Sequence, residues 1–359
     1  MTCLTYFAQS SSVSASTITR ITGSVPLSRT KIRPLSPSSS VTFAIAFITS
    51  GFSLASFLSA TLTFFNNCGK IVTSSVSFAS DCFFSSITSI NNNEVKIPST
   101  IEKIVSTAPS NTEILAGLGV GDKIVCMDTY SEGIEGVNKD VKKMDFTSPD
   151  SEAIIELDPD IVIASGYNKS GSSDDPFKSL SDVGIPVVYI PSSNSIDGIY
   201  QDIEFIASIV NEEAKGKEIV SNMKSEIEKI TKIGSTIKDK KKVYIEIGPA
   251  PNLYSVGNST FLNEMVELIG AENIFKDQNS WISPSEEVVI NKNPDVILTT
   301  VDYVTDPTKE IKSRSGWQNI NAIKNNDVYY IDANASSRPN QNIIKALKQM
   351  AKDVYPDLY

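Results

Sequence analysis

The feature that most constrains this chain is a stretch that occurs twice. Ser148–Ser165 reads SPDSEAIIELDPDIVIAS, and 135 residues later Ser283–Thr300 reads SPSEEVVINKNPDVILTT, with Ser, Pro, Glu, Ile, Pro and Asp at six matching positions. Each copy predicts a short helix after Ser-Pro and, after Pro-Asp, a strand apolar enough to be buried on both faces. An internal repeat of this kind predicts two similar lobes.

The similarity continues upstream of the repeated stretch. Lys103–Thr107 followed by a capping box from Ser110 to Glu113 corresponds to Lys242–Ile247 followed by a helix over Ser259–Ile269. Each lobe then reads β-α-β-α-β-α-β, an alternation that predicts a parallel sheet flanked by helices. The predicted fold class is α/β, with a ligand cleft between two lobes.

The chain divides into four parts. Residues 1–90 form an atypical segment, 101–195 a first binding lobe, 196–235 a joining helix, and 241–359 a second binding lobe. Apolar residues in the joining part recur at helical spacing, and the pattern breaks near Asn211. Its second piece, about 22 residues long, would span about 33 Å at 1.5 Å per residue, enough to connect the lobes stiffly.

Residues 1–90 contain a long apolar run, Val41–Phe65, without a charged residue. If helical, it would cross a hydrocarbon core of about 30 Å. The positive-inside rule would place residues 91–359 outside the cytoplasm, because four basic residues precede the run: Arg20, Arg29, Lys31 and Arg33. Cys68 comes after Phe-Asn-Asn, a poor match to a lipoprotein signal. We expect an extracytoplasmic protein anchored to the outer face of the cytoplasmic membrane; a wrongly assigned start is the alternative.

Composition excludes several classes of function. The chain has no histidine, which removes the commonest metal ligand and the usual general base at neutral pH. Residues 91–359 hold 27 Lys and Arg against 41 Asp and Glu, so nucleic acid is a poor partner. Cys126 lies alone in an apolar run and is expected to be a small buried residue. We expect a monomer without a catalytic residue, a cofactor or a metal site of its own.

Glu152 and Glu287 occupy the same position in the two repeats. They could be solvated glutamates at the positive ends of helices. They could also be the catalytic pair of a glycosidase-like hydrolase, which would need the two carboxyl groups within about 10 Å. One glutamate on each lobe better fits a pair of docking charges for a two-fold symmetric partner.

Ligands of open α/β sheets bind at the carboxyl ends of the strands, and here those loops are rich in aromatic residues. Such a collection favours a pocket for a large, partly apolar ligand. Arg338 could capture a ligand carboxylate or phosphate with two hydrogen bonds, or have only a surface or helix-start role; Arg314 is expected to be solvated. The candidate ligand-binding residues are Asn111, Tyr130, Phe146, Tyr167, Tyr254, Trp281, Tyr303 and Arg338.

Four motifs resemble one family, the substrate-binding proteins of ABC importers for iron-siderophore complexes, haem and vitamin B12. They are IVSTAPSNTEILAGLGVGDKIV, EAIIELDPDIV at Glu152–Val162, Gly270–Phe275, and Trp281 to Glu287 followed by Asn-Pro-Asp-Val-Ile. The resemblance implies a bilobal protein with a rigid interlobe helix. It also implies that Glu152 and Glu287 meet arginines of a permease dimer, which works with its ATPase.

The resemblance further implies that Tyr130, Phe146, Trp281 and Arg338 contact the ligand, as in members that bind vitamin B12. Members that bind anionic catecholate siderophores usually place several basic residues in the cleft, where Arg338 is nearly alone here. Histidine is absent, so haem would need a tyrosine ligand. This favours a neutral or weakly charged iron chelate or a corrinoid. The sequence therefore predicts a non-enzymatic receptor that delivers such a ligand to an importer, with a surface sensor or adhesin on the same scaffold as a further alternative.

Overall fold

The computed structural model describes residues 59–65, 71–77, 84–88, 94–168 and 175–359. Two antiparallel hairpins come first, β1 (Ser59–Phe65) with β2 (Ile71–Ser77), and β3 (Phe84–Thr88) with β4 (Glu94–Pro98). Strand β1 includes the last residues of the run Val41–Phe65, so that part is not helical; the rest of the run and Cys68 lie outside the described residues. Within the described ranges, no helix is long and apolar enough to cross a membrane.

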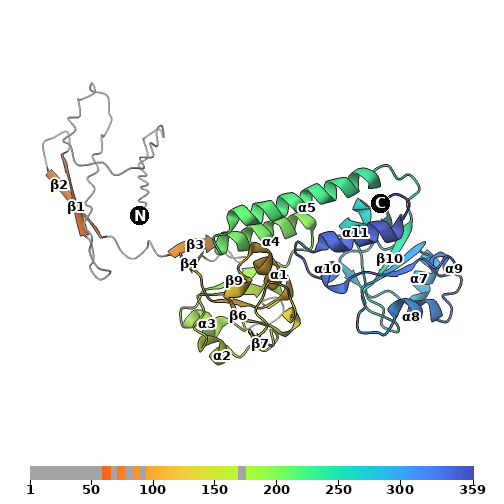
Figure 1. Cartoon of the computed structure of the whole chain (residues 1–359), viewed down its shortest axis with the longest axis horizontal. Helices are drawn as coiled ribbons and strands as arrows, with labels where there is room; N and C mark the ends of the chain where they lie inside the picture. The colour runs from red at the N-terminus through yellow and green to blue at the C-terminus, as the bar shows by residue number, and fades with distance from the viewer. Residues whose placement is uncertain (1–58, 66–70, 78–83, 89–93, 169–174) are drawn as a thin grey trace, which may run out of the picture. The chain divides into compact units, whose positions relative to one another are not determined.

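The first lobe is built on a five-stranded parallel sheet (Figure 1). Its strands, in spatial order, are β7 (Lys142–Met144), β6 (Ile124–Asp128), β5 (Ile104–Ser106), β8 (Ile161–Ser165) and β9 (Val187–Ile190). The α-helices of this lobe are α1 (Pro109–Leu118), α2 (Ser151–Ile155) and α3 (Lys178–Asp182), and short 3₁₀ turns occur at Gly121–Lys123 (η2), Thr129–Ser131 (η3) and Gly166–Asn168 (η4).

The second lobe repeats this plan with four parallel strands, β12 (Glu272–Asn273), β10 (Lys242–Glu246), β14 (Val296–Thr299) and β15 (Val328–Tyr330). Its helices are α6 (Phe261–Leu268), α7 (Glu286–Lys292), α8 (Pro307–Ser313), α9 (Asn321–Lys324), α10 (Ala333–Ser337) and α11 (Ile343–Val354). The predicted α/β alternation is confirmed in both lobes. The structure adds strand β7, and a small antiparallel pair formed by β11 (Ser255–Val256) and β13 (Trp281–Ile282).

The Pro-Asp of each repeat fastens its strand to the first strand of the same lobe. The Asp160 carboxylate accepts hydrogen bonds from the backbone N–H groups of Glu102 (2.7 Å) and Lys103 (2.9 Å). In the second lobe, Asp295 accepts from the N–H of Lys242 at 2.9 Å. The repeated aspartate therefore satisfies backbone donors where the first strand of each lobe begins, which fixes the alignment of the two central strands.

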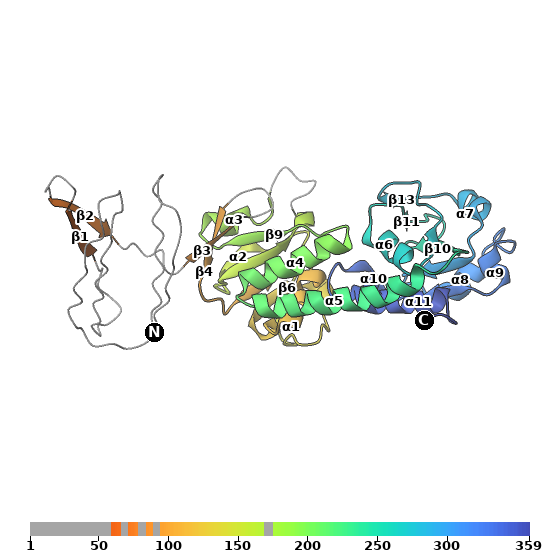
Figure 2. The same ribbon diagram turned by 90° about the horizontal axis from the view of Figure 1, so that it is seen from above.

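Two helices connect the lobes, α4 (Ile196–Ile209) and α5 (Glu213–Gly234). The break falls at Asn211, whose φ is +61°, as the sequence predicts. The two helices lie side by side (Figures 1 and 2), and α5 packs against α1 of the first lobe and against α6 and α11 of the second. Helix α4 also contacts the second lobe directly, because Glu264 of α6 accepts a hydrogen bond from the N–H of Ile196 at 2.8 Å.

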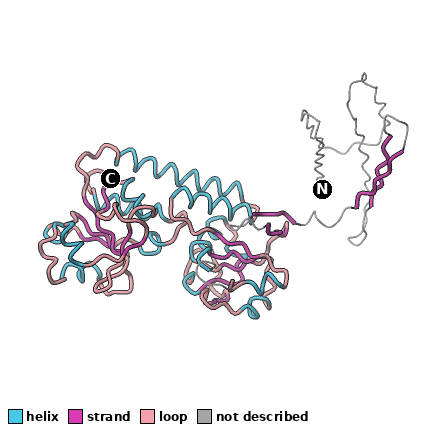
Figure 3. Tube along the Cα trace, turned by 180° about the vertical axis from the view of Figure 1, so that it is seen from behind, coloured by secondary structure: helices cyan, strands magenta, loops and turns pink. Residues whose placement is uncertain are grey.

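Apolar side chains cover both faces of each sheet. One cluster is continuous from the first lobe through α4 and α5 to α6 and α11 in the second. The opposite face of the first sheet packs against α2 and α3 through residues such as Phe177, and the opposite face of the second packs around Trp317. The Cα trace in Figure 3 shows strands enclosed by helices in each lobe. Cys126 is fully buried, as expected, and burial raises its pKa to about 11.

The expectation that Arg314 is solvated was wrong. Its side chain is 5% exposed and forms a two-point ion pair with Glu246 at 2.6 and 2.8 Å, while Glu310 binds the same guanidinium. Glu246 ends strand β10, and its side chain is 1% exposed. Burial raises the pKa of this carboxyl, although Arg314 acts in the opposite direction. The partners are 68 residues apart, a distance over which local patterns give no signal.

Candidate functional site

Three aromatic residues of the first lobe follow neighbouring strands at one edge of the sheet. Tyr130 comes after β6, Phe146 after β7 and Tyr167 after β8, and because these strands are parallel, their carboxyl ends share an edge. Tyr130 and Phe146 form an edge-to-face pair with ring centroids 6.2 Å apart. Tyr130 is 68% exposed and Tyr167 is also well exposed, so this edge presents aromatic surface to solvent.

Buried polar side chains hold these loops in place. The Asp128 carboxylate accepts hydrogen bonds from the Tyr130 N–H (2.9 Å) and from the Ser131 hydroxyl. The Asn168 side chain donates to the Phe146 carbonyl at 2.8 Å and accepts from the Thr107 hydroxyl at 2.8 Å. Burial raises the pKa of Asp128, opposed by those hydrogen bonds and by nearby Arg338. Asp128 and Asn168 are not among the site residues predicted from the sequence; the position of Asp128, two residues before Tyr130 at a strand end, is the signal that could have indicated it.

The second lobe presents a corresponding aromatic pair. Tyr254 and Trp281 are stacked, with ring centroids 6.2 Å apart and an interplanar angle of 10°. The pairing of β11 with β13 sets this geometry, because Val256 lies opposite Trp281 in the ladder. Tyr303 lies in the loop after β14 and is well exposed. Each lobe therefore supplies two aromatic rings in contact and one further exposed tyrosine.

Asn111, a predicted ligand contact, does not lie on the surface of the aromatic edge. It belongs to the first turns of α1 and is only 2% exposed. Its side-chain nitrogen has no hydrogen-bond partner among the residues that the structure describes. The side chain thus lies beneath the surface rather than on it.

The capping box predicted at Ser110–Glu113 is wrong, because Glu113 has other partners. Helix α1 begins at Pro109, and its N-cap residue makes no side-chain hydrogen bond. The Glu113 carboxylate instead binds three side chains of the second lobe: Arg338, Asn340 and Asn342. Arg338 also donates to the Tyr130 carbonyl at 3.1 Å. The candidate ligand-binding arginine is therefore located where the two lobes meet, beside the first aromatic pair.

Two cavities among the described residues lie away from the aromatic edge. One, of about 520 Å³, lies between the lobes and is bordered by Glu113, Glu132, Arg338, Gln341 and Lys345 among others. Neither cavity is lined by the six aromatic candidates. Within the same described ranges, no cluster of cysteine and acidic side chains is arranged to hold a metal ion.

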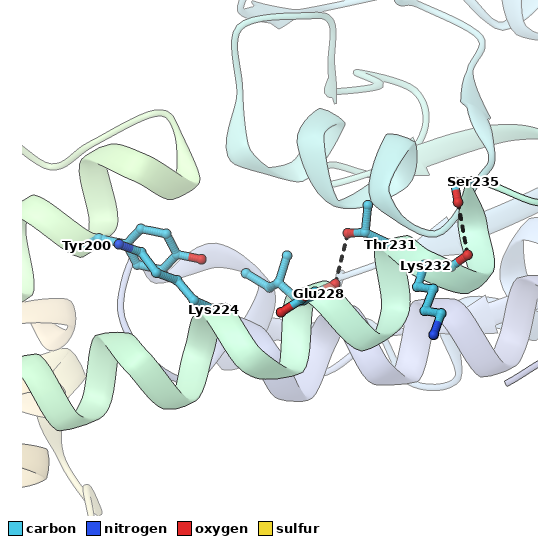
Figure 4. A pocket seen from close by; sticks show the side chains of 7 residues that line it. Tyr200, Lys224, Glu228, Thr231, Lys232 and Ser235 are labelled. Atoms are coloured by element: carbon cyan, nitrogen blue, oxygen red, sulfur yellow. Dashed lines mark hydrogen bonds between the residues drawn. The ribbon is translucent and has the colours of Figure 1, made fainter.

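The second cavity, of about 390 Å³, is a groove along α4 and α5 (Figure 4). Lys224 lies over the Tyr200 ring at 4.8 Å from its centroid. The hydroxyls of Thr231 and Ser235 bond to carbonyls of their own helix at 2.8 and 2.9 Å. These two hydroxyls are thus engaged within the helix and do not point into the groove as free donors for a ligand.

The two repeat glutamates lie on the surfaces of different lobes, Glu152 in the first turn of α2 and Glu287 in the first turn of α7 (Figure 1). The neighbouring Glu286 is engaged inside the lobe, since it accepts a hydrogen bond from the Trp317 indole at 2.7 Å. A hydrogen bond from Ser285 lowers the pKa of Glu287, which keeps it charged at neutral pH. Two exposed carboxylates on separate lobes do not form the facing pair that a glycosidase requires.

Comparison with known proteins agrees with this architecture. The family model for periplasmic binding proteins matches residues 104–335. An ABC transporter substrate-binding lipoprotein of Bacillus subtilis is 36% identical over 274 residues, which cover 75% of this chain and 85% of the relative. The vitamin B12-binding protein of Vibrio parahaemolyticus is 24% identical over 272 residues, 75% of this chain and 93% of that protein.

A solved structure from Staphylococcus epidermidis, described as a possible iron-binding, periplasmic solute-binding protein, is 34% identical with a TM-score of 0.64. It covers 72% of this chain and 100% of its own. The two-lobed α/β architecture, the repeated sheets and these matches lead to one conclusion: the chain belongs to the periplasmic binding protein family.

Proposed function

We propose that this substrate-binding protein of an ABC importer captures an iron chelate or a corrinoid. The observation that carries the proposal is the pair of aromatic contacts, Tyr130 with Phe146 and Tyr254 with Trp281, one at the carboxyl edge of each sheet. Flat apolar surfaces of this kind suit a large ligand with apolar faces. The vitamin B12-binding relative and the possible iron-binding neighbour support the same ligand classes. No hydrolase, sensor or adhesin is among these relatives.

The proposed ligand contacts come from both lobes. Tyr167 and Tyr303 would extend the surfaces formed by the two aromatic pairs. Arg338 would contribute by holding the Tyr130 backbone and by contacting the ligand at the junction of the lobes. Asn111 would be reached only after the covering residues move, because its side chain is buried.

Glu152 and Glu287 are proposed to dock the protein on its permease. A permease dimer, driven by its ATPase, presents two sites related by a two-fold axis, and one exposed glutamate on each lobe can meet both. Charge pairs of this kind mainly orient the partners and speed their encounter. The protein would act as a monomer.

The site of action is proposed to be outside the cytoplasm, at the outer face of the cytoplasmic membrane. The support is the lipoprotein named as such in Bacillus subtilis and the apolar, positively flanked segment near the N-terminus. Mass spectrometry of the first peptide of the native protein tests this. A lipid-free protein that starts well after Cys68 and fractionates with the cytoplasm would contradict it.

Ligand capture is tested by equilibrium dialysis of the full-length protein against cyanocobalamin and a neutral ferric trihydroxamate, with tryptophan quenching to locate the site. The chain has two tryptophans, and Trp317 is fully buried whereas Trp281 is half-buried at the aromatic edge. We expect quenching in the wild type and its loss in Trp281→Phe, while Phe146→Ala weakens binding about 2- to 10-fold, as loss of about 0.5–1.5 kcal/mol of aromatic contact implies. Absence of binding to both ligand classes would refute the proposal.

A further inference from the structure

Glu113 is the centre of a polar contact between the lobes. Its carboxylate is bound by Arg338, by the Asn340 amide at 2.8 Å and by the Asn342 amide at 2.6 Å. Its backbone carbonyl accepts from the Gln341 amide at 2.7 Å. All four donors belong to the second lobe, 225 to 229 residues later in the chain. The residue is 8% exposed, so this carboxylate is buried by the partners it binds.

The contact determines whether the charge of Arg338 is available at the candidate site. Arg338 has one guanidinium nitrogen on Glu113 and another on the Tyr130 carbonyl, so two of its nitrogens point into the protein. Arg314, the other arginine after residue 33, is committed to Glu246 and Glu310. Lys143, near the same edge, is paired with Glu132. The positive charges of these three side chains are therefore each balanced by a carboxylate.

An anionic ligand would have to compete with Glu113 for Arg338. If the ligand displaced Glu113, the largely buried Glu113 carboxylate would lose the guanidinium that balances its charge. An uncompensated buried charge is strongly unfavourable. The two asparagine amides would still bind the carboxylate but carry no net charge to balance it. A neutral ligand could stack on the aromatic rings and leave this pair intact.

We propose that Glu113 is a specificity-determining residue, which cancels the charge of Arg338 and makes the site select neutral ligands over anionic ones. The inference rests on the proposed capture of chelates or corrinoids and adds the charge class of the ligand. Glu113 acts through Arg338 and is a positioning residue, since its own carboxylate faces the second lobe. Its removal would release the guanidinium for two-point binding of a carboxylate, phosphate or catecholate.

The test compares matched neutral and anionic probes on the full-length protein by equilibrium dialysis. One pair is a neutral ferric trihydroxamate with a triply anionic ferric triscatecholate; the other is cyanocobalamin with its monocarboxylate derivative. We expect Glu113→Gln to raise affinity for the anionic member relative to the neutral one by at least about tenfold. The amide oxygen can still accept from an asparagine amide, so the variant keeps part of the contact.

Glu135→Gln is the matched control, because it makes the same charge change at the border of the same cavity and Glu135 takes no part in the ion pairs of Arg338 and Lys143; we expect a change below about twofold. The double variant Glu113→Gln/Arg338→Gln should lose the gain in anion affinity. Arg338→Gln alone leaves Glu113 uncompensated and should lower the anionic-to-neutral ratio, which provides a readout even if Glu113→Gln fails to fold.

Three results would overturn the inference. They are an unchanged ratio in Glu113→Gln, an equal shift in Glu135→Gln, or a shift that persists when Arg338 is also replaced. If the wild type binds neither member of either pair, the proposed function itself fails and the inference with it. Wild-type binding with an unchanged ratio in Glu113→Gln refutes the inference alone.

Discussion

Replacement of Arg314 by methionine tests the buried ion pair of the second lobe. The change leaves the Glu246 carboxylate, 1% exposed, without the guanidinium that now binds both its oxygens. Removal of one partner from a buried pair costs about 3–5 kcal/mol. The half-exposed contact with Glu310 adds about 0–1 kcal/mol, so we expect the second lobe to lose about 3–6 kcal/mol of stability.

The assay is urea unfolding, with tryptophan fluorescence as the signal. Both tryptophans, Trp281 and Trp317, belong to the second lobe, and the Arg314 guanidinium lies 4.6 Å from the Trp317 ring centroid. The signal therefore reports unfolding of the lobe in which the change is made, even if the two lobes unfold separately. The matched control is Arg314→Met/Glu246→Leu, which removes both charges and should recover most of the loss, because apolar replacements of a buried pair are often neutral or stabilising.

The pH dependence of the single variant has a definite sign. Burial already raises the pKa of Glu246 above its ordinary value of 4.5, and Arg314 opposes the rise. Without Arg314 the folded-state pKa rises further, so the folded protein binds a proton more readily than the unfolded chain. The destabilisation should therefore be smallest below about pH 4.5 and grow as the pH rises through the folded-state pKa. A single variant within about 1 kcal/mol of wild type at pH 7, or a double variant no more stable than the single, would refute the reasoning.

The remaining predictions concern docking, acid stability and thiol reactivity. Charge reversal in Glu152→Arg or Glu287→Arg should leave ligand affinity within about twofold and reduce uptake into cells, with the double variant lowest; wild-type uptake by the double variant would exclude the docking role. A hydrogen bond from Lys229 lowers the pKa of Glu226 to about 2, so its stabilisation is present above about pH 4.5 and lost as the pH falls toward 2. The stability difference between wild type and Glu226→Gln should shrink over that interval, and a constant difference would contradict the assignment. Cys126, with a pKa raised to about 11, should resist iodoacetamide at pH 8 in the folded protein and react in denaturant, as peptide mass spectrometry can show.

The features that the sequence predicts well are those encoded by local pattern. The repeat predicts both parallel sheets, and the apolar periodicity predicts helices that break at Asn211. Strand β7, Lys142–Met144, escapes prediction because it has three residues with two exposed lysines, so its pattern lacks the apolar run of a buried strand. The pairing of Glu113 with Arg338 escapes for a different reason: Glu113 fits a local capping motif, and the partners that outcompete it come from 225 residues away.

Helix α5 has a mechanical consequence for the whole binding protein. It packs on α1 in one lobe and on α6 and α11 in the other, and Glu226 ties it to Lys348 of α11. A continuous helix resists bending, because any sharp kink would break its own backbone hydrogen bonds. The distance between a surface residue of one lobe and a surface residue of the other is then set by the length of α5 and not by the bound ligand. A membrane partner that touches both lobes would therefore meet the same interlobe distance in the ligand-free and the ligand-bound protein. It would have to detect the ligand at the loops that follow the carboxyl ends of the strands.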